Sequence, residues 1–382
     1  MSKEIVHQLA SLAGITIGKD VIVRDERFYD RVFSDGSLGL GESYMEGWWD
    51  TGDKTLDQLS YIVNSTDLNE KLQGMSWELA FKMTLNWAWR LIFPVNTIEE
   101  SKVVAEQHYD LGNELYTKML GFPSLYSCGY YRNADSLIEA QVNKLELIAR
   151  KLQLAPGARV LEIGCGWGDL AVHLSRRAPG VHVTAITISE EQYNYCIRQH
   201  VNENVKFELV DYRKLDPHYK FDAIVSVGMF EHVNPNNYRE YMEICTHLLK
   251  DGGIFLLHTI GKNKSEIISD PWISKYIFPN STLPSLKQIM ESSEGLLVPE
   301  DVHNFGPYYD LTLQAWYRNF QTNFRAINQE RLLLGKSPFD AKFKRMWEYY
   351  LLMCAGLFRA RKAQLYQVVF SKNGPVYHRP DF

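Results

Sequence analysis

The fold of this 382-residue chain follows from the stretch Val160-Leu161-Glu162-Ile163-Gly164-Cys165-Gly166-Trp167-Gly168, a short apolar strand that runs into three glycines at alternate positions. Glycine tolerates a positive φ and lets the backbone approach a ligand closely, and a helix that begins near Trp167 would direct its first N–H groups at that ligand. The spacing is not the Gly-x-Gly-x-x-Gly of dinucleotide-binding folds. Glu162 would also repel a pyrophosphate, but it would tolerate a ligand that carries an amino group and a sulfonium. The stretch therefore predicts a ligand turn of this second kind, with a glycine turn of an unrelated α/β fold as the alternative.

Strands and helices alternate after this turn. Strands are predicted at 159–163, 182–187, 206–210, 221–227 and 254–259, and helices at 137–152, 167–177, 189–201 and 238–249. This alternation predicts a parallel sheet covered by helices, closed by a final strand at 365–370. Because such sheets bind ligands at the carboxyl ends of their strands, we expect a crevice beside Gly164, Thr187, Asp211, Gly228 and Thr259.

The composition excludes some classes of protein and favours others. The formal net charge is −5, which gives no overall attraction to nucleic acid, and the aromatic content of 13% indicates large apolar pockets or a well-filled core. The five cysteines form no Cys-x-x-Cys pair, so we expect neither a metal site nor a disulfide framework, and a reducing cytoplasm fits best. Residues 1–14 lack the features of a signal peptide, and no apolar run approaches the length of about 18 residues that a membrane span needs.

We expect a small, mainly helical N-terminal domain at 1–95, a linker at 96–101 and a larger domain at 102–382 that carries the glycine turn. In 36–49, glycines lie between large apolar and aromatic residues, so the backbone there must pack closely against a neighbour. In 77–93, apolar and aromatic residues recur with a helical period. That stretch would form a core or dimer face, or it would lie on a membrane or line an acyl groove.

Several stretches together resemble the cyclopropane fatty acid synthases, a family of methyltransferases that depend on S-adenosylmethionine (SAM). The glycine turn is similar to motif I of the SAM-dependent methyltransferases, and further similar segments lie at 36–49, 108–115, 126–130, 225–232, 256–261 and 303–306. The resemblance implies an α/β, Rossmann-like class I SAM methyltransferase fold, with a mostly parallel seven-stranded sheet and helices on both faces. It makes 102–382 the catalytic domain and 1–95 a lipid-associated domain, which favours the bacterial phospholipid enzymes over their shorter mycolic-acid relatives.

The resemblance also implies which residues contact SAM. They are Tyr109, Tyr126, Ser127, Gly164, Gly166, Thr187, Gln192, Asp211, Tyr212 and Arg213. The second strand ends in Thr187 and not in the acidic residue that often holds the ribose hydroxyls. Gln192 would take that role, and the missing acidic residue counts against NAD as the ligand.

A bound bicarbonate is implied as the general base. The residues that match its site are Cys128, Glu231, His258, Ile260 and Tyr309. A thiol, an imidazole, a phenol and a backbone N–H can all donate hydrogen bonds to an anion, and Glu231 would accept the anion's own proton or orient His258. Glu231 as the direct base is the rival interpretation. Taken singly, each of these residues is also compatible with a structural role, such as an inert buried thiol at Cys128.

The implied activity is the transfer of a methylene group from SAM to the cis double bond of unsaturated phospholipid acyl chains, forming cyclopropane fatty acids. A related lipid C-methyltransferase that gives a methyl-branched or methylene product is one alternative, and a non-catalytic lipid- or SAM-binding protein is another. We expect a homodimer in the cytoplasm, peripherally associated with the inner face of the cell membrane, where anionic lipids attract basic side chains. The candidate basic residues are Lys342, Lys344, Arg345, Arg359, Arg361 and Lys362, with ordinary solvated helix charges as the alternative.

Overall fold

The computed structural model describes the chain except for residues 67–110, 201–203, 267–268, 280, 375–376 and 381–382. The predicted SAM contact Tyr109, the aromatic stretch 77–93 and the predicted linker 96–101 lie outside the described residues. The chain divides into two compact units. Unit 1 comprises Met1–Val95, Ser269–Pro279 and Trp316–Lys362, and unit 2 comprises Asn96–Ile268, Asn280–Ala315 and Ala363–Phe382.

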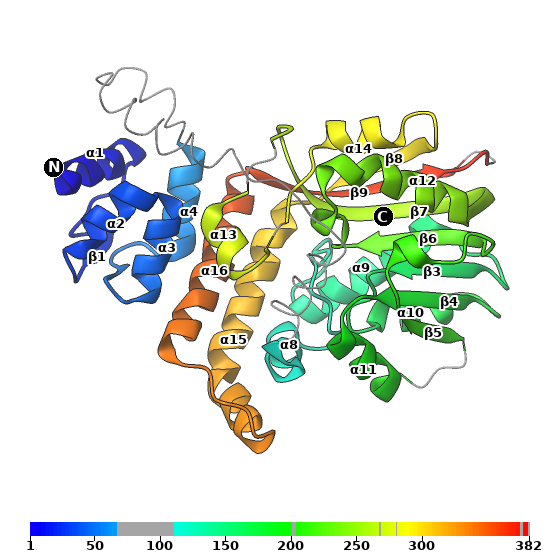
Figure 1. Cartoon of the computed structure of the whole chain (residues 1–382), viewed down its shortest axis with the longest axis horizontal. Helices are drawn as coiled ribbons and strands as arrows, with labels where there is room; N and C mark the ends of the chain where they lie inside the picture. The colour runs from blue at the N-terminus through cyan, green and yellow to red at the C-terminus, as the bar shows by residue number, and fades with distance from the viewer. Residues whose placement is uncertain (67–110, 201–203, 267–268, 280, 375–376, 381–382) are drawn as a thin grey trace. The chain divides into compact units, whose positions relative to one another are not determined.

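Unit 2 is built on a seven-stranded sheet (Figure 1). Its strands are β3 (Arg159–Ile163), β4 (His182–Thr187), β5 (Val205–Leu209), β6 (Phe221–Val227), β7 (Leu249–Lys262), β8 (Val298–Asn304) and β9 (Ala363–Ser371). They are ordered β5-β4-β3-β6-β7-β9-β8, with the first five parallel and both β7–β9 and β8–β9 antiparallel. The predicted α/β fold with a mostly parallel seven-stranded sheet is therefore confirmed.

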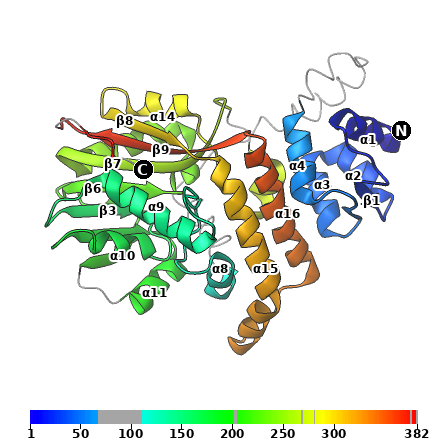
Figure 2. The ribbon, with the colours of Figure 1, turned by 180° about the vertical axis from the view of Figure 1, so that it is seen from behind.

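Helices cover both faces of this sheet, as Figure 1 and the reverse view in Figure 2 show. The helices of unit 2 are α8 (Asn113–Leu120), α9 (Leu137–Leu152), α10 (Asp169–Ser175), α11 (Glu190–Gln199), α12 (Tyr238–Leu248), α14 (Leu286–Ser293) and the start of α15 (Pro307–Leu333). One apolar layer joins α9 and α10 to residues such as Val160 and Val225, and the other joins α12 and α14 to Leu161 and Ile224. Neighbouring residues of one strand thus enter opposite layers, because strand side chains alternate between faces.

Two features of the sheet differ from the prediction. β7 runs to Lys262 because the whole length of β9 pairs with it, from Ile254↔Ser371 to Lys262↔Ala363. Thr259 is therefore a buried residue inside a strand and does not lie at the strand end that we predicted. β8 was not expected as a strand, because its polar sequence Val-Pro-Glu-Asp-Val-His-Asn has no run of β-forming residues.

Unit 1 is mainly helical. It contains α1 (Ser2–Ala13), β1 (Val21–Val23), α2 (Arg27–Asp35), α3 (Ser37–Met45), β2 (Trp49–Thr51), α4 (Leu56–Ser65), α13 (Pro271–Tyr276), the rest of α15, and α16 (Ala341–Arg359). Residues 102–382 thus do not form one unit, since α13 and α16 belong with the N-terminal helices. The cause is close packing of α16 on α4, where a Cβ at Gly356 would lie 2.3 Å from the Asp57 carbonyl oxygen.

Three of the six basic residues that were predicted to bind the membrane form ion pairs within unit 1. Lys342 forms an ion pair with Glu46, and an Arg345 guanidinium nitrogen lies 2.8 Å from an Asp50 carboxylate oxygen. Arg359 pairs with Asp57 at the same distance of 2.8 Å. These three cations hold α16 to the N-terminal helices, so they are not free to serve only as a lipid-binding patch. No helix among the described residues is both long and apolar enough to cross a bilayer.

Candidate functional site

The glycine turn has the predicted backbone. Gly164, Gly166 and Gly168 have φ of 84°, 55° and 87°, values that favour glycine, and α10 begins at Asp169, two residues after the predicted start. A Cβ at Gly164 would lie 2.9 Å from the Met229 Cβ. A Cβ at Gly166 would meet no atom within 4 Å, because this residue borders an open pocket.

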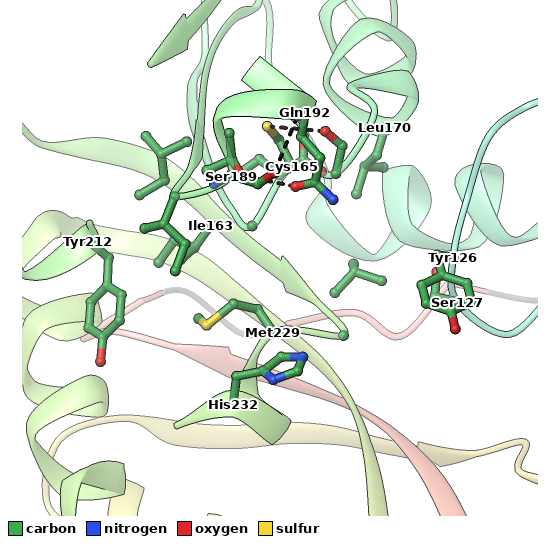
Figure 3. A pocket seen from close by; sticks show the side chains of 18 of the residues that line it. Tyr126, Ser127, Ile163, Cys165, Leu170, Ser189, Gln192, Tyr212, Met229 and His232 are labelled. Atoms are coloured by element: carbon green, nitrogen blue, oxygen red, sulfur yellow. Dashed lines mark hydrogen bonds between the residues drawn. The ribbon is translucent and has the colours of Figure 1, made fainter. Parts of the chain in front are cut away.

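This pocket lies where β3, β4, β5 and β6 end. Nine of the ten predicted SAM contacts line it: Tyr126, Ser127, Gly164, Gly166, Thr187, Gln192, Asp211, Tyr212 and Arg213. Figure 3 shows Gln192, Tyr212 and Ser127 on different sides of the same open space. Gly228, predicted for the crevice, also lines the pocket, whereas Thr259 does not.

Thr187 and Gln192 form a unit on one wall. The Thr187 hydroxyl donates to Gln192 Oε1 at 3.0 Å, and both side chains are buried. Because this bond occupies the amide oxygen, Gln192 offers its NH₂ group to the pocket (Figure 3). On the neighbouring strand end, Arg213 Nε donates to Asp211 Oδ1 at 2.9 Å, so these two charges compensate each other.

The segment that contains Tyr126 and Ser127 is held by the helices behind it. The Ser124 backbone N–H donates to Asp169 Oδ2 at 2.9 Å, and Gln141 Nε2 donates to the Ser127 carbonyl oxygen at 3.0 Å. Lys144 Nζ donates to the Ser127 hydroxyl at 2.6 Å. Sequence reasoning missed Gln141 and Lys144, although two polar residues on the apolar face of a predicted helix were a visible signal.

Glu162, the last-but-one residue of β3, is another pocket residue. Its side chain is buried, and Oε2 has no hydrogen-bond partner among the described residues. Burial raises the pKa of this carboxyl, and the nearby Cys196 and Asp169 add to the effect. A buried carboxyl with an unused oxygen is suited to a ligand that brings a positive charge.

Glu231 and Ile260 are in direct contact. The Ile260 backbone N–H donates to Glu231 Oε1 at 2.7 Å, so it points at this carboxylate in the structure and not at a separate anion. Burial raises the pKa of Glu231 to about 7. The other carboxylate oxygen, Oε2, is buried without a partner among the described residues.

His258 lies on the same strand, two residues before Ile260. Its Nδ1 is 3.1 Å from the amide nitrogen of Gln367 on β9, and its Nε2 is buried without a partner in the described part of the chain. Burial holds the pKa of His258 well below its usual value, so the ring is neutral near pH 7. Because the Gln367 amide N–H donates to Nδ1, the single proton of the neutral ring is on Nε2. Gln367 was not predicted, because it is 109 residues away in sequence.

Cys128 and Tyr309 lie near the start of α15. The Cys128 side chain is completely buried, with the Thr312 hydroxyl 3.8 Å from its sulfur, and Thr312 lies one turn after Tyr309. Burial raises the pKa of Cys128 to about 12, so it is a thiol and not a thiolate at neutral pH. Four of the predicted anion-site residues, Cys128, Glu231, His258 and Tyr309, are buried, and Ile260 is half-buried. None of the five lines the pocket at the glycine turn.

The family model that matches the chain is described as mycolic acid cyclopropane synthetase, and it covers residues 96–368. The chain is 46% identical to the cyclopropane-fatty-acyl-phospholipid synthase of Escherichia coli (strain K12), over 96% of this chain and 93% of the relative. It is 30% identical to a tuberculostearic acid methyltransferase of Mycobacterium tuberculosis, over 93% of this chain and 83% of that protein.

Among solved structures, a mycolic acid cyclopropane synthase complexed with S-adenosylhomocysteine (SAH) and CTAB is similar, with a TM-score of 0.63 and 28% identity. The match covers 71% of this chain and 98% of that one. With the pocket at the glycine turn and a family match over most of its length, this chain belongs to the cyclopropane synthase family of SAM-dependent methyltransferases.

Proposed function

We propose that this protein transfers a methylene group from SAM to the cis double bond of unsaturated phospholipid acyl chains, forming cyclopropane fatty acids. The observation that carries the proposal is the pocket itself, which combines positive-φ glycines with the buried, unsatisfied carboxyl of Glu162. The relative that is 46% identical over 96% of the chain bears the name of this activity.

The pocket residues fit SAM by their chemistry. Bound SAM supplies a methyl group on a positive sulfur, a strong electrophile. Glu162 would favour the ammonium group of the amino-acid end, while Gly164 and Gly166 let the backbone come close. Gln192 would direct its NH₂ group to an oxygen of the ligand, in place of an acidic ribose ligand at the end of β4.

The reaction also needs a base and a dry site. An alkene that gains a methyl group leaves a cation on its other carbon, and a proton must leave the methyl before the ring closes. Dry walls keep water from trapping that cation. We propose that Cys128, Glu231, His258, Ile260 and Tyr309 form the site of a bicarbonate that serves as the base, with Ile260 acting through the hydrogen bond of its N–H to Glu231.

The protonation states of these residues support the assignment. His258 is neutral and its unused Nε2–H is a donor, and Cys128 is a protonated thiol. The free Oε2 of Glu231 is an acceptor for the proton of the anion. Because Glu231 already holds the Ile260 N–H, it is also placed to act as the base itself, and this remains the rival.

The activity test uses vesicles of unsaturated phospholipid incubated with the protein and SAM. We expect fatty acids heavier by one CH₂ that lack a double bond. Unmodified fatty acids at every protein concentration would contradict the proposal. Buffer stripped of CO₂ should lower the rate, and added bicarbonate should restore it. Full activity without bicarbonate, together with complete loss in Glu231→Gln, would make Glu231 the base.

A second candidate product is a methyl-branched or methylene fatty acid. The observation in its favour is the 30% identity to a tuberculostearic acid methyltransferase over most of both chains. The same vesicle assay separates the two products, because reduction after methyl transfer adds two further hydrogens, and a methylene product keeps a double bond.

We further propose that the protein acts as a homodimer, in the cytoplasm, bound peripherally at the inner face of the membrane. The substrate class supports this proposal, since acyl chains of phospholipids are reached from a bilayer surface. Sedimentation equilibrium measures the dimer, and fractionation of cells with high-salt washing measures the association with the membrane. A monomer at micromolar concentration would contradict the first part.

A further inference from the structure

Helix α9 buries two lysines on one face, seven residues apart. Lys151 is fully buried and has a counterion, since its Nζ lies 2.9 Å from Asp301 Oδ2. Lys144 is 1% exposed and forms no ion pair with any carboxylate in the described part of the chain. Its Nζ donates to the hydroxyl of Ser127 at 2.6 Å and to the carbonyl oxygen of Ser127 at 3.4 Å.

A buried ammonium without a counterion is costly, because water that would solvate the charge is excluded. Burial accordingly lowers the pKa of Lys144 to about 7. A methionine or leucine at this position would avoid the cost. The hydrogen bonds of Lys144 to Ser127 hold that segment, but a neutral donor would serve for this, so we look for a ligand that explains the charge.

The surroundings of Lys144 indicate an anion on the pocket side. The charged and titratable groups that act on it are Cys128, before α9, and Asp169 on α10, and Lys144 in turn acts on His258 of β7. Cys128 is a neutral thiol, and Asp169 Oδ2 is held by the Ser124 backbone N–H. Lys144 itself lines the pocket at the glycine turn, beside Ser127.

We propose that Lys144 is a positioning residue for the carboxylate of SAM: its ammonium donates to the Ser127 hydroxyl, turns that hydroxyl into a donor toward the pocket, and supplies the positive charge that this carboxylate requires. The inference rests on the proposed function, because it identifies the ligand as SAM. The carboxylate is the only anionic group of SAM, and Lys144 is the only cation of the pocket lining, in the described residues, that lacks a carboxylate partner; Arg213 pairs with Asp211.

Proton uptake is a direct consequence. A carboxylate beside Lys144 raises its pKa, since an opposite charge favours the charged form. Affinity for a ligand with a carboxylate should therefore be highest below pH 7 and should fall as the pH rises above 7. Calorimetry in buffers of different ionisation enthalpy should show protons taken up on binding near pH 7.5.

The test compares two probes in the full-length protein. SAH carries the carboxylate, and methylthioadenosine lacks the amino-acid end. Lys144→Met removes the charge and the hydrogen bond, while Lys144→Gln retains a donor without charge. We expect both variants to bind SAH roughly ten- to a hundredfold more weakly, the range for a lost hydrogen bond to a charged group, and to bind methylthioadenosine as the wild type does.

Lys151→Met is the matched control, because it removes the other buried lysine of α9 and should leave SAH affinity unchanged. The melting temperature of Lys144→Met should equal or exceed that of the wild type, whereas a lysine with a purely structural role would lower it when removed. The pH dependence of SAH affinity and the proton uptake should vanish in Lys144→Met.

Two results would overturn the inference: unchanged SAH affinity in Lys144→Met, or equal losses of affinity for both probes. A lost response to bicarbonate together with unchanged SAH affinity would assign the charge to the proposed bicarbonate site. Failure of the wild-type protein to bind SAH would instead contradict the proposed function, so the two failures are distinguishable.

Discussion

At the scale of single residues, the glycine turn makes a direct prediction. Gly166 has a φ of 55°, and the space at its Cβ position is open pocket. Replacing it with leucine would force a left-handed conformation at a cost of about 1–2 kcal/mol and place side-chain atoms where we propose SAM binds. We expect calorimetry to show SAH binding lost while circular dichroism shows a folded protein. Unchanged SAH affinity would show that the ligand lies elsewhere.

Glu231 makes a second prediction at this scale, on stability as a function of pH. Its pKa is about 7 in the folded protein and near 4.5 in the unfolded chain, so the folded state binds more protons between these values. Stability from this group is thus fully present below about pH 4.5 and decreases by roughly 3 kcal/mol as the pH rises to 7. Glu231→Gln keeps the shape of the side chain and removes its ionisable group.

The melting temperature of Glu231→Gln relative to the wild type should therefore be higher at pH 8 than at pH 5, measured by differential scanning fluorimetry. Catalytic activity should be lowered at both pH values. If the difference in melting temperature does not change with pH, the carboxyl is not protonated in the folded state near neutrality, and its role as a proton acceptor must be reconsidered.

At the scale of elements, the ion pair between Lys151 on α9 and Asp301 on β8 joins a helix to the edge strand of the sheet. Asp301 has a second partner, since the Arg379 guanidinium lies 3.3 Å away, and the Lys151 ammonium lies 2.9 Å from the other Asp301 oxygen. Asp301→Asn would leave Lys151 as an uncompensated buried charge and should cost about 3–5 kcal/mol in urea unfolding. Lys151→Met should cost less. The reverse ranking would contradict this assignment of partners.

The packing of α16 on α4 makes another prediction for elements. Gly356 lies against the backbone of α4, where a Cβ would be 2.3 Å from the Asp57 carbonyl oxygen and 2.7 Å from the Tyr61 nitrogen. Backbone atoms cannot move aside as a flexible side chain can. Gly356→Ala should therefore destabilise unit 1 by about 1–3 kcal/mol, despite the better helix propensity of alanine. A more stable variant in thermal unfolding would show that the two helices are not in close contact.

For the whole molecule, the net charge of −5 means that binding to anionic vesicles must come from a local basic surface. Lys344 and Lys362 remain candidates, because neither forms an ion pair within the described residues. We expect tighter co-sedimentation with anionic than with zwitterionic vesicles, weakening with salt. Charge reversal at Lys344 and Lys362 should reduce co-sedimentation without changing SAH affinity.

Charge reversal at Lys342 and Arg345 is the control. It should instead lower the melting temperature, since both residues pair with carboxylates of unit 1. If co-sedimentation changes neither with salt nor with charge reversal at Lys344 and Lys362, these two lysines are ordinary surface charges.

The sequence alone determined the alternation of strands and helices and the place of the ligand turn. The predicted bounds of β3, β4, β6 and α9 match the structure residue for residue, because hydrophobic period, a Ser136 capping box and glycine turns are local properties of the chain. Nine predicted pocket residues also lie together. Seven of them lie at or after the carboxyl ends of neighbouring strands, whereas Tyr126 and Ser127 come from the segment before α9.

Only the tertiary structure decided which distant segments meet. The pairing of β9 with β7 extends β7 to Lys262, holds β8 at the sheet edge and brings Gln367 to His258. The same is true of α16, which belongs to the N-terminal unit, and of Lys144, whose lack of a counterion is visible only when its neighbours are known. Local period and propensity describe a segment by itself, whereas these features depend on which side chains and backbone groups a folded chain places opposite one another.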